Sequence, residues 1–140
     1  MAMPVFWGMT QKSTQNNTQG KRNLRDVGAR GEDEAAAYFE DLGYRLLARN
    51  FYTARGEVDI VLHAPADQTP STVVFVEVKW RVDDRHGTGA EAVTVAKLNA
   101  MRHAATRWLE KNPEHRAPQV RFDVLDITAG EITHYEGVEW

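Results

Sequence analysis

Cysteine is absent from this 140-residue chain, which excludes disulfide bonds, iron–sulfur clusters, thiol catalysis and cysteine-ligated zinc. Long apolar runs are also missing. None approaches the roughly 20 residues that cross a bilayer, and the first ten residues lack the basic and apolar parts of a secretory signal. These absences predict a cytoplasmic protein with no membrane association. The length suits a single domain.

Basic residues do not outnumber acidic ones, as they usually do in proteins that bind nucleic acid. Seventeen Lys and Arg stand against 20 Asp and Glu, which gives a net charge of −3 and a pI of about 5.9. The charge is unevenly spread: residues 56–78 hold four acidic and no basic side chains, whereas residues 79–116 hold eight basic and five acidic ones. Because Lys and Arg drive phosphate binding, a nucleic-acid partner would meet the second segment, with modest affinity.

Apolar periodicity predicts an α/β domain in which helices flank a mixed β-sheet. The polar composition of residues 10–22 predicts a disordered tail over residues 1–22, which leaves residues 23–140 as one domain. One helix is predicted from Gly31 to a stop at Gly43, and another from the N-cap Thr94 to Lys111. The predicted strands are residues 44–51, 57–62, 72–80 (the most apolar, typical of a central strand), 120–127 and 131–135.

Ionisable side chains interrupt the two central strands. Glu77 and Lys79 share one face of their strand, and Asp59 lies in the neighbouring apolar strand. Buried charges must pair, bind a metal or line a cleft, and carboxylate oxygens are what hard divalent ions such as Mg²⁺ prefer. The pattern therefore predicts a metal site, and the alternative is a set of cross-strand ion pairs. Glu57 is the substitute ligand if Asp59 points away.

On the first predicted helix one acid faces inward. At 100° per residue, Glu32 lies within the apolar stripe of Ala35, Ala36 and Phe39. This position predicts a cation beside Glu32, and the alternative is an acid that simply favours the dipole of the first helical turn. No two histidines have the spacing of metal ligands, so all five are predicted to lie at the surface.

A series of short segments carries a resemblance to a known family. They are Gly31-Glu32-Asp33, Gly43-Tyr44, Ala48-Arg49-Asn50-Phe51, Gly56-Glu57-Val58-Asp59-Ile60-Val61, Phe75-Val76-Glu77-Val78-Lys79, Glu91-Ala92-Val93-Thr94 and Arg121-Phe122-Asp123-Val124. In this order they resemble the bacterial YraN family, which is similar to restriction-endonuclease-like PD-(D/E)xK nucleases and to archaeal Holliday-junction resolvases.

The resemblance implies a metal-dependent endonuclease with a restriction-endonuclease-like core that acts on structured or branched DNA. Asp59 and Glu77 would be ligands of Mg²⁺ or Mn²⁺, and the backbone carbonyl of Val78 would complete the protein's share of the coordination. Lys79 matches the motif lysine and would position the attacking water. Glu32 matches a helix glutamate of resolvase-like members and would assist. Resolvases act as symmetric dimers, which implies a homodimer.

Three basic residues after the second acid are expected to contact backbone phosphates: Arg81, Arg85 and Lys97. Two positions depart from the family pattern. Trp80 stands where Thr or Ser is usual, and Leu98 stands where related nucleases have a supporting Gln. The second departure favours an alternative function, a catalytically inactive nucleic-acid-binding adaptor that keeps the fold.

Overall fold

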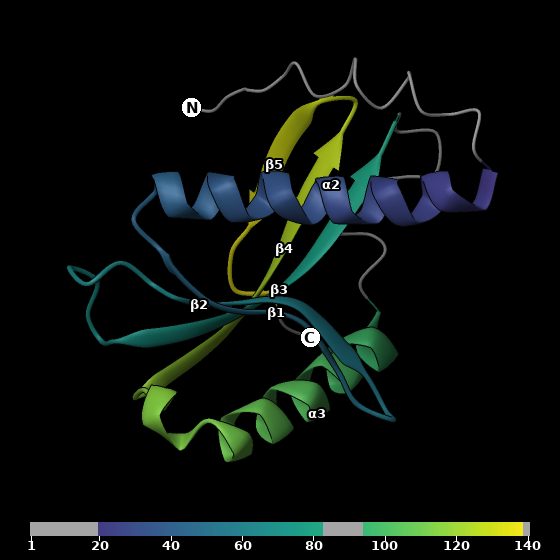
Figure 1. The fold of residues 1–140 in the computed structure, drawn as a ribbon. Helices are drawn as coiled ribbons and strands as arrows, with labels where there is room; N and C mark the ends of the chain where they lie inside the picture. Colours follow the sequence, from purple (N-terminus) through teal and green to yellow (C-terminus); the bar gives the residue numbers. More distant parts are fainter. Residues whose placement is uncertain (1–19, 83–93, 139–140) are drawn as a thin grey trace.

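The computed structural model describes residues 20–82 and 94–138, and side chains from residue 31 onward within them. The elements in chain order are α2 (Gly20–Asp41), β1 (Arg45–Tyr52), β2 (Glu57–His63), β3 (Thr72–Arg81), α3 (Val95–Lys111), the short 3-10 helix η2 (Pro113–His115), β4 (Gln119–Thr128) and β5 (Glu131–Tyr135). Figure 1 shows the sheet between the two long helices. This arrangement confirms the α/β class and is consistent with a nuclease-like core.

The five strands form one mixed sheet in the order β1-β2-β3-β4-β5. All neighbours pair antiparallel except β3 and β4, which are parallel over their whole length, from Thr72 opposite Gln119 to Arg81 opposite Thr128. Parallel strands need a crossover connection, and α3 lies in the connection between these two strands. The strand predicted as central, β3, is therefore central.

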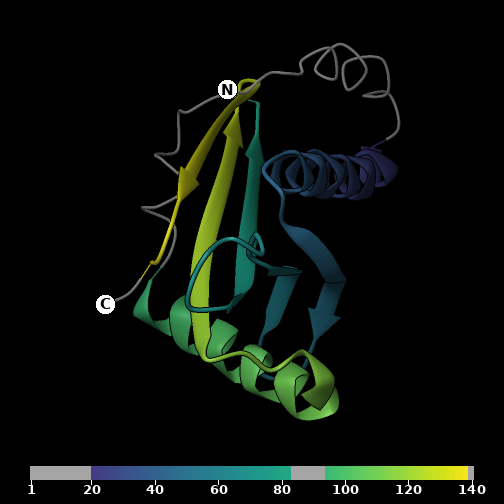
Figure 2. The ribbon, with the colours of Figure 1, turned by 90° about the vertical axis from the view of Figure 1, so that its left-hand side faces the viewer.

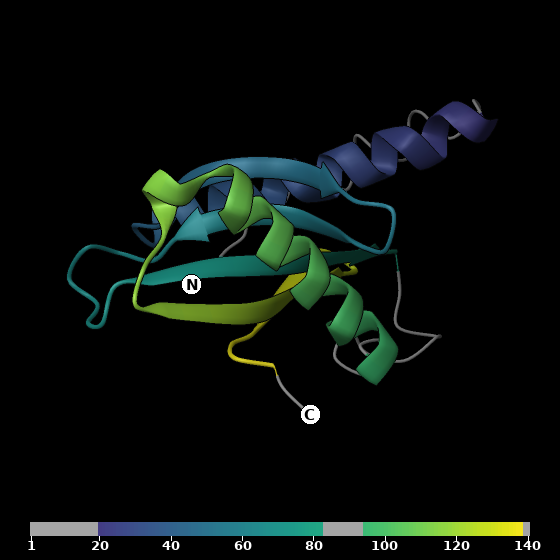
Figure 3. The same cartoon turned by 90° about the horizontal axis from the view of Figure 1, so that it is seen from below.

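The two long helices cover opposite faces of the sheet (Figures 1 and 2). The strand period of two sorts the residues of β3 between the faces. Val74 and Val76 belong to the apolar cluster beneath α2, whereas Val73 and Phe75 belong to the cluster beneath α3. Figure 3 shows α3 crossing its face of the sheet obliquely. The odd-numbered residues that follow Phe75 continue along the α3 face.

Two predicted helix boundaries are confirmed. Gly43 adopts a φ of 94°, a conformation that side chains disfavour, and its amide bonds to the Glu40 carbonyl where α2 ends. Thr94 is the N-cap of α3, because its hydroxyl accepts a hydrogen bond of 3.1 Å from the Lys97 amide.

The start of the first helix was predicted wrongly. Gly31 was expected to begin it, but α2 begins at Gly20, so Gly31 and Glu32 lie inside the helix. The predicted tail, which ended at residue 22, correspondingly overlaps α2, and residues 1–19 lie outside the described part of the chain. Glycine inside a helix costs about 1 kcal/mol relative to alanine, which explains why propensity suggested a boundary at Gly31.

Packing explains why glycine occupies position 31. A Cβ atom there would lie 2.8 Å from the Cβ of Trp80 and 2.9 Å from its Cδ1. Real Cβ atoms do not approach other carbons so closely, so the helix backbone can reach β3 only because this side chain is missing.

Gly31→Ala is therefore expected to lower the free energy of unfolding by about 1–3 kcal/mol, because overpacking outweighs the gain in helix propensity. Urea denaturation measures the change. Ala37→Gly, at an exposed position of the same helix, isolates propensity and should cost about 1 kcal/mol. A Gly31→Ala protein more stable than the wild type would contradict the packing argument.

No helix within residues 20–82 and 94–138 is long and apolar enough to cross a membrane.

Candidate active site

The site begins where β2 and β3 separate. The ladder between these strands runs from His63–Val73 to Ile60–Val76 and stops there. Beyond it, the Asp59 carboxylate takes the place of a ladder partner, and its Oδ2 accepts a 2.8 Å hydrogen bond from the Val78 amide. This bond fixes Asp59 against the backbone of β3, beside Glu77.

Glu77 is a buried carboxylate held by two lysines. Its side chain is 6% exposed, and it lies on the α3 face of β3. Oε2 is 3.0 Å from Nζ of Lys79 on the same strand, and Oε1 is 3.4 Å from Nζ of Lys97 in the first turn of α3. Both lysine side chains are less than a third exposed. Asp59, Glu77 and Lys79 thus come together as the strand pattern predicted.

The neighbourhood disfavours a charge on Asp59. Burial, followed by the negative charge of Glu77, raises the pKa of Asp59 to about 7, although the hydrogen bond from Val78 opposes the rise. Glu32 and Glu57 raise this pKa further. Three carboxylates therefore repel a charge on Asp59 at this end of the sheet, and a bound cation would relieve this repulsion.

A pH dependence of stability follows from Asp59. An aspartate with an ordinary pKa near 4 in the unfolded chain and about 7 in the folded protein stabilises the fold below pH 4. That contribution is lost as the pH rises from about 4 to about 7. In EDTA at pH 8, Asp59→Asn should therefore increase the free energy of unfolding, by about 1–3 kcal/mol after screening at a half-buried site.

Urea denaturation between pH 4 and pH 8 measures this gain, which should shrink to near zero at pH 4. Asp67→Asn, in an exposed loop, is the matched control and should show no such trend. Added Mg²⁺ should stabilise the wild type and not Asp59→Asn. If Asp59→Asn increased the free energy of unfolding equally at pH 4 and pH 8, ionisation of Asp59 would not destabilise the fold, which would contradict the prediction.

Glu32 reaches this region from α2. Its side chain is 17% exposed, and Oε1 lies 3.6 Å from Nη2 of Arg49 on β1, which also bonds Asp33 at 2.9 Å. The cation expected beside Glu32 is thus Arg49. The dipole interpretation is wrong, because Glu32 is the thirteenth residue of α2 and the effect fades within the first turn.

The three expected phosphate contacts have different surroundings. Lys97 lies at the site, but its Nζ is paired with Glu77. Arg81 forms a 3.1 Å ion pair with Asp126 on β4 and is 21% exposed, so a phosphate would have to compete with that pair. Arg85 lies outside the described residues.

Two charged residues near the site were missed from the sequence. Arg49 carries no local signal, because only the fold brings β1 beside Glu32. Asp126 could have been found, since it interrupts the apolar run of β4 as Glu77 does in β3. It lies opposite Lys79 in the parallel register and is 5% exposed. Charged side chains on the α3 face therefore come from both β3 and β4.

The residues present fit a hard divalent ion. Residues 20–82 and 94–138 contain no group of three or more His, Asp or Glu side chains placed to hold a metal. Two carboxylates and a carbonyl suffice for Mg²⁺, which commonly keeps several waters. Within the described chain, the buried Oε1 of Glu77 accepts no hydrogen bond, so one oxygen remains able to coordinate.

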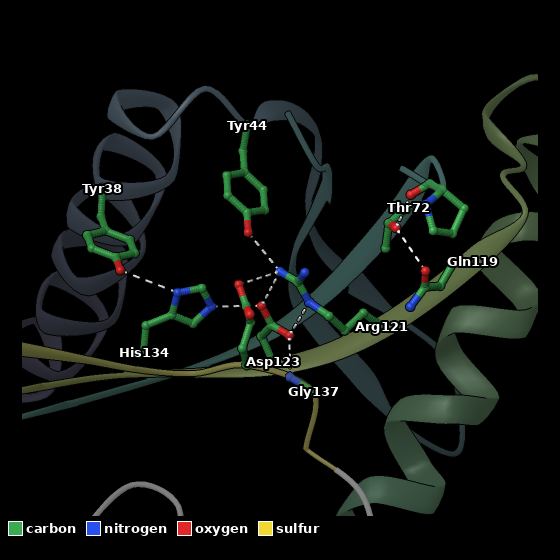
Figure 4. Close-up of polar contacts among 10 residues, drawn as sticks. Tyr38, Tyr44, Thr72, Gln119, Arg121, Asp123, His134 and Gly137 are labelled. Atoms are coloured by element: carbon green, nitrogen blue, oxygen red, sulfur yellow. Dashed lines mark hydrogen bonds and ion pairs between the residues drawn. The ribbon is translucent and has the colours of Figure 1, made fainter. Parts of the chain in front are cut away.

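A second polar cluster lies on the α2 face, apart from this site (Figure 4). Asp123 is fully buried in β4 and accepts hydrogen bonds from Arg121, His134 and the Gly137 amide. Nε2 of His134 donates to Asp123, and the hydroxyl of Tyr38 lies 3.3 Å from the other ring nitrogen. His134 is only 13% exposed, so the prediction that every histidine lies at the surface is wrong.

The cluster on the α2 face ties α2 to the β4–β5 edge. It presents no group toward Asp59 or Glu77, because residues 121 and 123 lie on the opposite face of the sheet from residue 126. We therefore assign the cluster to the stability of the fold.

The structure defines a small α/β protein whose fold is consistent with a nuclease-like core, with a carboxylate–lysine cluster at one end of its central strands. Residues 31–127 match the profile described as "Uncharacterised protein family UPF0102". The chain belongs to this UPF0102 (YraN) family, as the resemblance of its motifs predicted.

Similar proteins occur in several bacteria. A UPF0102 protein of Mycolicibacterium gilvum is 45% identical over 117 residues, which cover 80% of this chain and 92% of that protein. One from Mycolicibacterium vanbaalenii is 41% identical over 124 residues, covering 85% and 98%. One from Bifidobacterium longum subsp. infantis is 46% identical over 112 residues, covering 77% and 86%.

Proposed function

We propose that this protein is a metal-dependent endonuclease that hydrolyses phosphodiester bonds in structured or branched DNA in the bacterial cytoplasm. The observation that carries the proposal is the proximity of Asp59, which accepts a hydrogen bond from the Val78 amide, to the Glu77–Lys79 ion pair on the adjacent strand. Burial, together with the charge of Glu77, raises the pKa of Asp59 to about 7, and carboxylates perturbed in this way cluster at functional sites.

Asp59, Glu77 and the Val78 carbonyl would hold Mg²⁺ or Mn²⁺. When bound, the ion would lower the pKa of a coordinated water and offset negative charge that develops on the phosphate. In the overall reaction, water adds to phosphorus while one phosphorus–oxygen ester bond breaks. The leaving oxygen takes up a proton, which yields a phosphate monoester and a hydroxyl end.

Lys79 would act on the attacking water and on the phosphate. Its Nζ is 3.0 Å from Oε2 of Glu77, and the Lys79 side chain is 28% exposed, so it is held by Glu77 and is still accessible to substrate. Glu32 would contribute to the site through its charge, which raises the pKa of Asp59. The ion pair with Arg49 holds the Glu32 side chain in place.

The test is cleavage of four-way junction, flap and linear duplex DNA in Mg²⁺, Mn²⁺ and EDTA. We expect metal-dependent cleavage, faster on the branched substrates. Glu77→Ala and Lys79→Ala should each abolish it. Cleavage that survives both substitutions would place the activity elsewhere, and absence of cleavage on every substrate would remove the proposal.

Leu98 favours a second candidate function, a non-catalytic DNA-binding adaptor. This residue is 1% exposed and packs in the core beneath α3, so no polar side chain is available at the position where related nucleases have Gln. The adaptor predicts salt-dependent binding of junction DNA without cleavage in either metal.

We further propose a homodimer, because a symmetric junction presents paired scissile strands and each copy would supply one cluster. Light scattering with and without junction DNA tests the stoichiometry, and a single copy per junction would oppose it.

A further inference from the structure

Lys97 is an unusual residue for its place in α3. It is the third helical residue after the N-cap Thr94, and the first turn contains no acid. Helix N-termini disfavour cations, and the third position is where Glu or Gln commonly completes a capping box. Local helix stability therefore argues against a lysine here, and the partner that explains it is Glu77, 3.4 Å from its Nζ.

The two lysines hold Glu77 unequally. Nζ of Lys79 lies 3.0 Å from Oε2, within the range of a hydrogen bond, and both residues belong to the same strand. Nζ of Lys97 lies 3.4 Å from Oε1, and this oxygen is buried without a hydrogen bond within the described chain. Charge-assisted hydrogen bonds are normally 2.7–2.9 Å long. Oε1 is therefore the oxygen that another cation can take more easily.

The backbone of Lys97 is fixed while its side chain can move. Its amide donates to the hydroxyl of Thr94 at 3.1 Å, which holds the first turn, whereas the side chain is 29% exposed. A released Nζ would remain close to the positive end of α3, where a phosphate is also favoured.

We infer that Lys97 exchanges partners: it neutralises Glu77 in the metal-free protein, and a divalent ion displaces it so that it can bind a DNA phosphate. The inference rests on the proposed function. It makes Lys97 a coupling residue, since the metal releases a phosphate-binding cation and, by linkage, DNA must strengthen metal binding. A double-stranded or branched backbone would thus be bound tightly only by the metal-loaded protein.

The experiment compares the full-length wild type with Lys97→Met, and with Lys97→Gln as a second variant that is more polar. Titration calorimetry with Mn²⁺ alone should show about threefold to fivefold tighter binding in both variants, because a competing ion pair is gone. Junction binding is then measured in EDTA and in Ca²⁺. In EDTA the variants should match the wild type within about twofold, whereas in Ca²⁺ they should bind about threefold to fivefold more weakly.

Lys111→Met is the matched control, because Lys111 is exposed in the last turn of the same helix. It should leave Mn²⁺ affinity unchanged and affect DNA binding equally in EDTA and in Ca²⁺. Mn²⁺ affinity that is unchanged or weaker in both Lys97 variants would overturn the inference and leave the proposed nuclease standing. A wild type that binds no Mn²⁺ would overturn the inference and the proposed metal site together.

Discussion

Replacing Asp123 by alanine is expected to lower the free energy of unfolding by about 3–5 kcal/mol, a large share of the stability of a small domain. The side chain is 0% exposed, and its two oxygens accept four hydrogen bonds of 2.7–3.0 Å. Truncation would leave Arg121, which is 16% exposed, with only the exposed Glu136 as a carboxylate partner. Urea denaturation followed by circular dichroism measures the loss.

Glu136→Ala is the control for the Asp123 substitution. Glu136 lies 3.4 Å from the same guanidinium but is 55% exposed, so its removal should cost at most about 1 kcal/mol. Equal losses in the two variants would show that burial does not set the strength of this cluster.

The contribution of Asp123 to the free energy of unfolding depends on pH with the opposite sign to that of Asp59. Burial alone would raise the pKa of Asp123, but hydrogen bonds from His134, Arg121 and Gly137 outweigh it and lower the pKa. A lowered folded pKa gives stability that is present above the unfolded value near 4 and is lost as the pH falls below it. The difference between wild type and Asp123→Asn should therefore be full at pH 7 and shrink below pH 4.

Under the proposed function, Glu77→Gln is expected to reduce metal-dependent cleavage by at least about 10³-fold, since it removes one of the two proposed anionic metal ligands and the anchor of Lys79. Glutamine has nearly the same volume, and both paired lysines are partly exposed, so they can turn to solvent. The fold should therefore persist. Single-turnover cleavage of junction DNA measures the rate, and circular dichroism checks the fold.

Glu57→Gln serves as the matched control for Glu77→Gln. Glu57 is an exposed acid at the start of β2 that affects Asp59 only through its charge. Its substitution should leave cleavage within about threefold of the wild type, because screening in water weakens such an effect. A comparable loss in Glu57→Gln would mean that net charge near the site, rather than coordination by Glu77, controls the rate.

The site residues differ in how far the sequence could place them. Strand alternation placed Glu77 and Lys79 on one face of their strand, because the period of a strand is a local property. The apolar residues around Asp59 indicated that it belongs to a neighbouring strand. Arg49 beside Glu32, Lys97 beside Glu77 and Asp126 beside Arg81 join different elements. Their proximity depends on strand order and helix placement, which local patterns do not specify.

The helix boundaries show the same division. Thr94 and Gly43 act through hydrogen bonds and backbone angles within a few residues, so their roles were predicted correctly. Gly31 acts through Trp80, which is 49 positions away in the chain, and propensity alone misplaced the start of α2 there. His134 was misjudged for an equivalent reason, since its buried partner Asp123 lies on another strand.

By itself the sequence determined the α/β class, the extents of the strands and of α3, the family, and the acids and lysine of the candidate site. These features follow from local periodicity, capping and short motifs. Only the tertiary structure decided that Glu77 has two lysine partners, that Asp59 bears a raised pKa and that Asp123 stabilises the edge of the sheet. Burial and pairing set these energies, and both come from residues that are distant in the chain and adjacent only after folding.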